Sequence, residues 1–118
     1  MTPDPSYRSL IERLHNSGVR TYTLHPDQLV ISRQTGSAWP DRGNSFWISC
    51  AGKDWYLCTW GPVCYRVAAG TDLAELSVAL VEIGVEAQVR VPAELIERFA
   101  LVELDDEQTQ AFLDSLRP

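Results

Sequence analysis

Cysteine and histidine are the residues of this chain with the most versatile chemistry, and the sequence contains Cys50, Cys58, Cys64, His15 and His25. Thiolates and imidazoles are the usual ligands of zinc. Their spacing, however, includes no Cys-x-x-Cys pair and no His-x-x-x-His pair. Neither histidine stands beside a nucleophile in a known motif. We therefore expect no metal site and no cofactor.

The positions of the cysteines on an expected sheet lead to the same conclusion. If both turns between residues 45 and 67 have two central residues, Cys58 lies on the face opposite Cys50 and Cys64. Cys50 and Cys64 then share a face but lie two strands apart, a separation of about 15 Å. That distance is too long for a disulfide or a shared ion. We expect three reduced thiols, of the buried kind that is common among free cysteines.

Motifs of catalysis are missing from the sequence. It has no Gly-x-Ser-x-Gly, no phosphate-binding loop and no Gly-x-Gly-x-x-Gly pattern. Asp105, Asp106 and Glu107 cluster at an expected helix start, where the helix dipole favours carboxylates without any catalytic role. The sequence therefore favours a protein that is not an enzyme.

Tryptophan and arginine most often dominate the energy of a protein interface. Trp39 and Arg42 lie in a long loop, residues 34–44, which could move to meet a partner. Trp55 and Arg66 fall on strands and share a face in the expected register. The predicted binding residues are therefore Trp39, Arg42, Trp55 and Arg66. In the alternative interpretation both tryptophans are core residues. If neither tryptophan is needed for folding or for binding, the next candidate is the acidic surface formed by Glu94, Glu97, Asp105 and Asp106.

The elements that must position these residues begin with residues 45–67, which read as three short strands joined by tight turns. Gly52 and Pro62 mark the turns. One face is expected to carry Trp47, Ser49, Tyr56, Cys58, Trp60, Val63, Tyr65 and Val67. The opposite face is expected to carry Phe46, Ile48, Cys50, Trp55, Leu57, Thr59, Cys64 and Arg66. Both faces are apolar, so we expect helices to cover one face, and the other to be covered by further chain, buried in an oligomer or left as a partner-binding surface. Trp47, Trp60, Tyr65 and Leu57 should be largely buried.

The rest of the chain alternates helix and strand patterns. The apolar spacing predicts helices over residues 6–17, 72–83 and 105–116, with a short helix after Pro92. It predicts strands over residues 19–24, 29–33 and 85–91, the last at an edge. The predicted fold class is α+β, an antiparallel meander of about five strands packed by an N-terminal helix and two or three C-terminal helices. The length of 118 residues predicts one domain, residues 1–118.

Charge and composition limit the classes of partner. Residues 1–70 hold seven basic and five acidic side chains, and residues 71–118 hold three basic and eleven acidic, which gives +2 and −8 and the net charge of −6. An acidic protein is poorly suited to duplex nucleic acid. No apolar run approaches the ~20 residues that span a bilayer, and the N-terminus lacks the pattern of a signal peptide. We expect a cytoplasmic protein that contacts no membrane.

Together these features predict a small non-enzymatic interaction module of the adaptor, regulator or inhibitor type. Its partner would be another protein or a second copy of itself, bound through an aromatic sheet face or the acidic helices. The alternative is a small-molecule-binding protein or enzyme with a pocket between the sheet and the 34–44 loop. The sequence lacks a basic cluster at the helix after the sheet, which argues against RNA binding.

Overall fold

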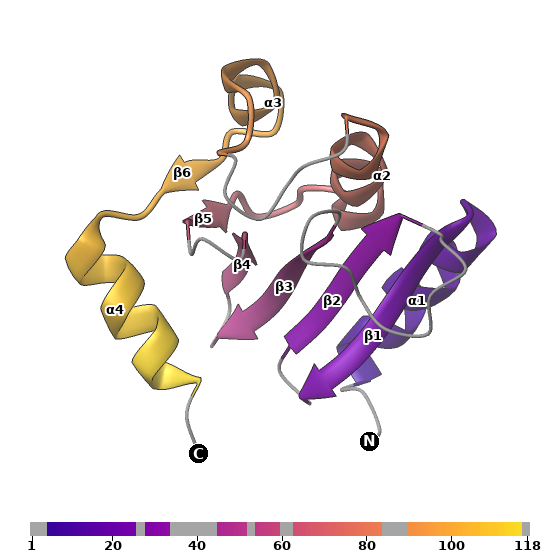
Figure 1. The fold of residues 1–118 in the computed structure, drawn as a ribbon, viewed down its shortest axis with the longest axis horizontal. Coiled ribbons are helices and arrows are strands. Elements are labelled where there is room, and N and C mark those ends of the chain that lie inside the picture. Colours follow the sequence, from indigo (N-terminus) through magenta and orange to yellow (C-terminus); the bar gives the residue numbers. More distant parts are fainter. Residues whose placement is uncertain are drawn as a thin grey trace.

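The computed structural model describes residues 5–25, 28–33, 45–51, 54–59, 63–83 and 90–116. Six strands form one antiparallel sheet in which the spatial order follows the sequence order (Figure 1). They are β1 (Val19–His25), β2 (Gln28–Arg33), β3 (Ser45–Ala51), β4 (Asp54–Cys58), β5 (Cys64–Val67) and β6 (Val102–Glu103). Each strand therefore pairs with the strand that follows it in the sequence.

One helix, α1 (Pro5–Asn16), precedes the strands in the sequence. The helices α2 (Leu73–Ile83), α3 (Ala93–Arg98) and α4 (Asp106–Ser115) follow β5. The predicted α+β class and the antiparallel meander are confirmed. The sixth strand was not predicted, because two residues are too few to show an alternating pattern. β6 pairs with β5 through Tyr65 with Glu103 and Arg66 with Val102.

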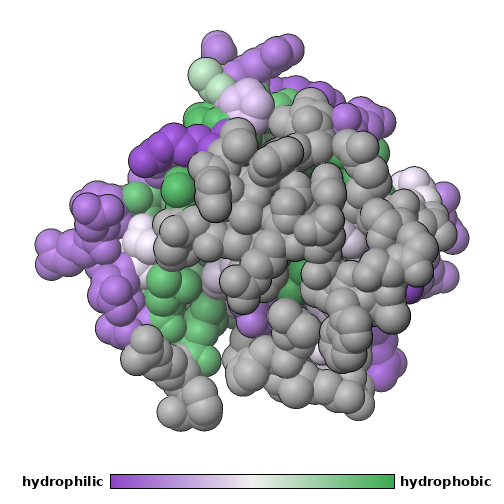
Figure 2. Space-filling model, in the orientation of Figure 1, coloured by the Kyte–Doolittle hydropathy of each residue, from purple (hydrophilic) through white to green (hydrophobic). Residues whose placement is uncertain are grey.

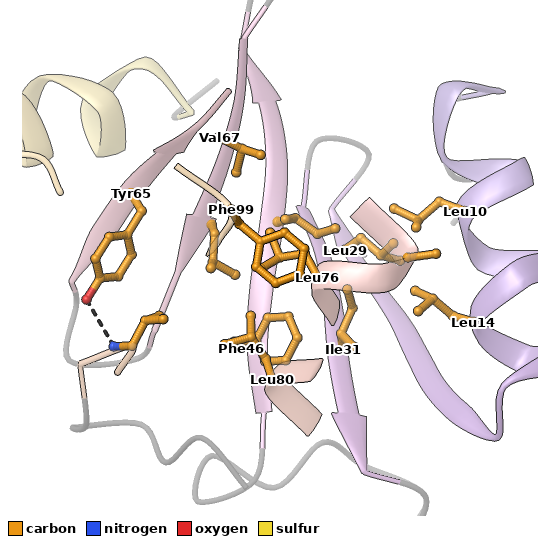
Figure 3. Close-up of a cluster of buried hydrophobic side chains, with 14 of the residues drawn as sticks. Leu10, Leu14, Leu29, Ile31, Phe46, Tyr65, Val67, Leu76, Leu80 and Phe99 are labelled. Atoms are coloured by element: carbon orange, nitrogen blue, oxygen red, sulfur yellow. Dashed lines mark hydrogen bonds between the residues drawn. The ribbon is translucent and has the colours of Figure 1, made fainter. Parts of the chain in front are cut away.

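The face of the sheet toward α1 and α2 forms the main hydrophobic core (Figure 3). The side chains of Leu29, Ile31, Phe46, Ile48, Leu57 and Tyr65 line it, since paired residues of adjacent strands point to the same side. α1 adds Tyr7, Leu10 and Leu14, which recur at the helical spacing predicted for its apolar stripe, and α2 adds Leu76 and Leu80.

The opposite face of the sheet carries a smaller cluster of buried residues, which contains Val30, Trp47, Cys58, Cys64 and Phe112. The last of these belongs to α4, so this helix lies on the other side of the sheet from α1 and α2. The side of α4 toward the rest of the molecule shows hydrophobic side chains and its outer side is hydrophilic (Figure 2). The apolar character of both sheet faces therefore reflects helices on both sides.

The predicted register is right for β3 and β4 and wrong for β5. Cys50 pairs with Trp55, as expected for a turn of two central residues. The next connection contains three residues, 60–62, because the N–H of Thr59 donates to the carbonyl of Val63. Cys58 therefore faces Cys64, not Tyr65. One extra residue in the connection moves every side chain of β5 to the other face.

Three of the four predicted core residues, Trp47, Leu57 and Tyr65, are buried, which confirms that part of the prediction. Trp60 lies outside the described residues, as does most of the predicted strand 85–91. Arg90 and Val91, which are described, belong to no strand. No helix in the described part of the chain combines the length and apolar character needed to cross a membrane.

Candidate functional site

An open hollow of about 530 Å³ lies where α1, α2 and α3 meet on the outer side of the main core. Its floor comes from small side chains of α2, namely Ala74, Val78 and Ala79. Its rim is polar and is formed by Arg13, Asn16, Ser17, Glu75, Glu82 and Arg98. We call this hollow the three-helix groove. It joins segments that are far apart in the sequence.

The end of α1 fixes the first wall of the groove. Gly18 adopts a positive φ of 78°, the left-handed conformation that ends helices and that glycine tolerates best. Its N–H donates to the carbonyl of His15, and the Ser17 hydroxyl donates to the carbonyl of Arg13 at 3.0 Å. These bonds satisfy carbonyls of the last turn and hold Arg13 beside the start of α2.

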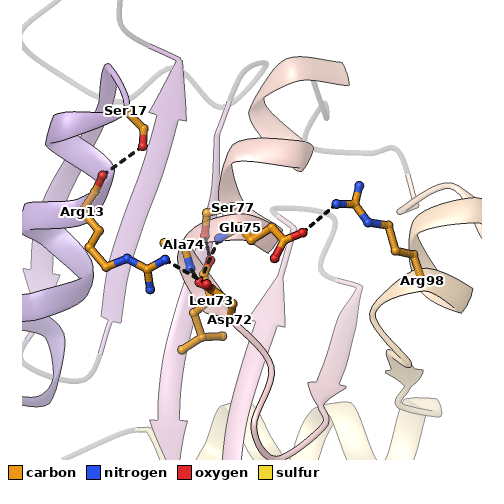
Figure 4. A network of polar contacts seen from close by, with 8 residues as sticks. All are labelled: Arg13, Ser17, Asp72, Leu73, Ala74, Glu75, Ser77 and Arg98. Carbon is orange, nitrogen blue, oxygen red and sulfur yellow. Dashed lines mark hydrogen bonds and ion pairs between the residues drawn. The ribbon is translucent and has the colours of Figure 1, made fainter.

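Asp72 connects α1 to the start of α2 (Figure 4). Its Oδ1 accepts hydrogen bonds from the N–H groups of Ala74 and Glu75, both at 3.1 Å, and thereby caps the helix. Its Oδ2 lies 2.8 Å from Nη2 of Arg13. The hydrogen bond from Arg13, followed by those from the helix N–H groups, lowers the pKa of the Asp72 carboxyl.

Arg98, at the end of α3, forms another wall of the groove. Its Nη2 lies 2.8 Å from Oε1 of Glu75, and its guanidinium stands 4.7 Å from the centroid of the Phe99 ring. α3 ends in a Schellman motif, in which the N–H of Leu101 donates to the carbonyl of Ile96. Ala100 holds the position with positive φ, 52°, where glycine is usual.

The rim of the groove is polar and exposed to solvent. Both ion pairs at its rim are largely exposed, so solvent screens them and each contributes little to folding. Glu82 is exposed, and no ion pair joins it to any other described residue. A small apolar floor between charged rims matches the anatomy of a polar-rimmed binding surface. Within the described ranges, no group of three or more His, Cys, Asp or Glu could hold a metal ion.

Of the predicted binding residues, the structure describes Trp55 and Arg66 and places them on opposite faces of the sheet. Trp39 and Arg42 lie outside the described residues. Trp55 is half-buried on the main-core face, with its ring edge-on to Tyr7 at a centroid distance of 5.2 Å. Arg66 is exposed and pairs with Tyr56, so it points to the opposite face from Trp55. The expectation that Trp55 and Arg66 share a face is wrong because β5 is shifted by one residue.

Arg66 lines a second hollow, about 340 Å³, between α4 and the face of the sheet that it covers. Tyr56, Leu104, Gln108 and Phe112 line it too. The Phe112 ring stacks on Tyr56 with centroids 4.3 Å apart and on Trp47 at 6.0 Å. This hollow is therefore walled by an aromatic stack, with Arg66 as its cation.

Cys58 and Cys64 form the polar centre of the face under α4, and the sequence interpretation missed this pair. Their Sγ atoms are 2.6 Å apart, and all three cysteines of the chain are thiols in this structure. Burial raises the pKa of the Cys58 thiol, whereas the hydrogen bond from Cys58 lowers the pKa of Cys64. The available signal in the sequence was the length of the connection between β4 and β5. That length allows the observed register, with three residues between Thr59 and Val63, as well as the expected register with a two-residue turn.

Of the remaining candidates from the sequence, His15 and Asp105 have structural partners. His15 Nε2 lies 3.1 Å from Oγ1 of Thr21. Asp105 caps α4, where its side chain accepts from the Gln108 N–H at 2.7 Å and the Gln108 side chain accepts from its N–H in return. Glu94, Glu97 and Asp106 are exposed on α3 and α4. These carboxylates are therefore exposed on two separate helices, and their role in binding stays a prediction.

Comparison with known proteins gives no further constraint on the site. No protein-family model, curated protein or solved structure matches this chain. The fold and the site define an α+β domain whose six-stranded antiparallel meander has helices on both faces.

Proposed function

We propose that this chain is a non-enzymatic interaction module that binds a segment of a partner protein in the three-helix groove. The observation that carries the proposal is the open groove itself, with its apolar floor of Ala74, Val78 and Ala79 between charged rims. Grooves of this kind accept a chain segment through small apolar contacts along the floor and polar contacts at the edge.

Charge indicates what the segment should carry. Arg13 and Arg98 each have a carboxylate partner, whereas Glu82 has no ion pair within the described residues. A basic side chain of the partner would therefore meet Glu82. The acidic character of residues 71–118 would also attract a basic segment over longer distance and raise the association rate.

Cys58 and Cys64 are thiols although they are in contact, which favours a reducing compartment, so we propose the cytoplasm as the place of action. The binding role predicted for Trp39, Arg42, Trp55 and Arg66 stays a prediction, as does self-association. The alternative function, a small-molecule pocket between the sheet and the 34–44 loop, lies outside the described residues. Thermal shift with a metabolite collection tests it, because a ligand of the folded state raises the midpoint with concentration.

Site-specific crosslinking tests the groove. A photoreactive residue in place of Ala79 reports contacts on the floor, and one in place of Gln110 on the exposed side of α4 is the control. We expect the Ala79 position to crosslink a discrete partner that mass spectrometry identifies. Equal crosslinking from both positions would contradict a groove-specific interaction.

Binding of the purified partner then tests the charge argument. We expect Glu82→Lys to weaken the partner about 10-fold, or ~1.4 kcal/mol. Glu107→Lys, which makes the same change at an exposed position of α4, should leave affinity within about two-fold. Circular dichroism confirms that both variants fold. Wild-type affinity in a folded Glu82→Lys variant would remove the groove from the proposal.

A further inference from the structure

Cys58 and Cys64 stand directly opposite each other at the open end of the β4–β5 hairpin. Cys58 is the last residue of β4 and Cys64 the first of β5. The N–H of Thr59 donates to the carbonyl of Val63, which makes the adjacent cysteine pair a non-hydrogen-bonded pair. Side chains at such pairs approach most closely, and the two thiols are in contact.

This placement fits the geometry that a disulfide requires. Directly opposed residues of antiparallel strands have Cα atoms about 4.5–5.5 Å apart, within the range of about 4.4–6.8 Å found for disulfides. Both side chains point to the same face, so no rotation of either strand is needed. Cys50 is on the opposite face, paired with Trp55, and cannot take part.

We propose that Cys58 and Cys64 form a site of reversible oxidation, which a hydroperoxide closes to a disulfide and a thiol reductant reopens. In reducing compartments, disulfides are usually transient and respond to redox conditions. Two thiols that the fold already holds in contact fit that role. The inference concerns the β4–β5 hairpin and does not depend on the partner proposed for the three-helix groove.

The reaction balances in two steps. The thiolate of Cys64 attacks one oxygen of the hydroperoxide, the O–O bond breaks, and the leaving hydroxide or alkoxide takes the thiol proton, which leaves a sulfenic acid on Cys64. The thiol of Cys58 then attacks that sulfur, the S–O bond breaks, and the hydroxyl leaves as water with the Cys58 proton. Two thiols are oxidised and one hydroperoxide is reduced.

The two thiols have different surroundings that fit these roles. Cys64 accepts the hydrogen bond from Cys58, which stabilises its thiolate and lowers its pKa. Cys58 is the more desolvated thiol, with a raised pKa, and reacts second. Ser49 adds a buried hydroxyl on the same face that has no hydrogen-bond partner among the described residues, and it is available to a polar oxidant.

Access to the pair requires movement on the α4 side of the sheet, because both thiols are fully buried. Phe112 is the one fully buried residue of α4 and stacks on Trp47 and Tyr56, and the partly buried Leu113 packs on the same cluster. A helix held by so little buried surface opens more readily than the core. Opening of α4 would admit the oxidant, and weakening of its contact should speed the reaction.

Tryptic digestion of the full chain separates the relevant cysteines. Cleavage after Lys53 and Arg66 places Cys58 and Cys64 on one peptide, residues 54–66, and Cys50 on another, residues 43–53. After treatment with hydrogen peroxide and alkylation of the remaining thiols, we expect the 54–66 peptide to be unalkylated and lighter by two hydrogen atoms. Dithiothreitol should restore both thiols.

Four variants make the test decisive. Cys50→Ser should still form the internal disulfide, whereas Cys58→Ser and Cys64→Ser should not. Phe112→Ala should raise the oxidation rate several-fold, because it loosens α4. The proposal is overturned if the native chain keeps both thiols of the 54–66 peptide while Cys50 is oxidised, or if sulfonic acid forms there without a disulfide. A thermal midpoint that rises on oxidation of folded Cys50→Ser provides a second readout.

Discussion

The two faces of the sheet are built in different ways. The face toward α1 and α2 is a continuous layer of aliphatic and aromatic side chains, with Leu14, Ile31 and Leu80 fully enclosed. The face toward α4 buries polar groups: the two thiols, and the hydroxyls of Ser32, Ser45 and Ser49. Both faces exclude solvent from their centres, but only the first does so with apolar groups almost alone.

The difference shows where the stability of the domain comes from. α1 and α2 each insert several apolar residues into the main core, whereas α4 buries Phe112 only. Apolar burial contributes about 25 cal/mol per Å², so the first face carries most of the hydrophobic stabilisation. The second face keeps thiol and hydroxyl side chains, and moving α4 away from it costs less free energy than moving α1 or α2 from the first face.

Two phenylalanines, one on each face, give the sharpest test of this comparison and the largest expected effect. Phe46 is 2% exposed in the main core and Phe112 is 7% exposed under α4. Phe46→Ala should lower the free energy of unfolding by about 3–5 kcal/mol, as large aromatic deletions in cores do. Phe112→Ala should cost less, about 2 kcal/mol, because α4 can shift to close the space. Urea denaturation measures both.

The order of those two effects decides the comparison. Equal losses would show that α4 is as tightly coupled to the sheet as α2 is. A larger loss from Phe112→Ala would reverse the assignment of the main core. Hydrogen exchange adds an independent check, since amides of α4 should exchange before those of β2 and β3.

The sequence predicts the main-core face well and the other face only in part. Helix caps and apolar stripes locate α1, α2 and α4, because these signals are local. Gly52 and the two-residue turn locate the β3–β4 register. The β5 register fails because Cys64, Tyr65 and Val67 are all apolar, and alternate positions therefore do not distinguish the two faces. That one-residue shift concealed the thiol pair.

The three-helix groove could not be predicted for a different reason. Arg13 and Asp72 are separated by 59 positions and Glu75 and Arg98 by 23. Their meeting depends on how α1, α2 and α3 pack on the sheet, and no pattern in a single sequence encodes that packing. The predicted site lacked this information and relied on residue type, so it joined Trp55 and Arg66 from opposite faces.

Tyr65 tests how strongly the main-core face depends on a single polar contact. Its hydroxyl accepts a hydrogen bond from the N–H of Val91 at 3.1 Å (Figure 3). Tyr65→Phe keeps the ring but leaves that buried N–H without its acceptor, so we expect a loss of about 1–3 kcal/mol. Thermal and urea unfolding measure it. An unchanged stability would mean that water replaces the hydroxyl and that the segment at Val91 is open to solvent.

Ser49 should give the opposite sign on the second face. Its hydroxyl is buried without a partner among the described residues, which costs stability in the native protein. Ser49→Ala removes that cost, and we expect stability to rise by about 1 kcal/mol. Ser77→Ala is the matched control, because the Ser77 hydroxyl donates to the carbonyl of Leu73 at 2.7 Å on the main-core side.

The control should change stability little or lower it, since alanine offsets the lost hydrogen bond only through its better helix propensity. A decrease in Ser49→Ala as large as that in a hydrogen-bonded serine would show that Ser49 has a partner after all. The two faces would then no longer differ in whether their buried hydroxyls are hydrogen-bonded.

The smallest expected effect is a pH dependence at the edge of the main-core face. The pKa of Asp72 is lowered first by the hydrogen bond from Arg13, so Asp72 stabilises the fold when it is ionised. Its contribution is therefore fully present above the unfolded pKa of about 3.9 and is lost as the pH falls through the lower folded value. Between neutral pH and that window the contribution should be constant.

Asp72→Asn separates the charge from the helix cap, because asparagine also caps helices well. The variant should lose the part of the acid sensitivity that arises from this group, while its stability near neutral pH changes less than in any variant above. Thermal midpoints measured from neutral to acidic pH, for wild type and variant, show the difference directly. Parallel curves would mean that Asp72 titrates alike in the folded and unfolded states, and that α1 and α2 are joined by apolar packing alone.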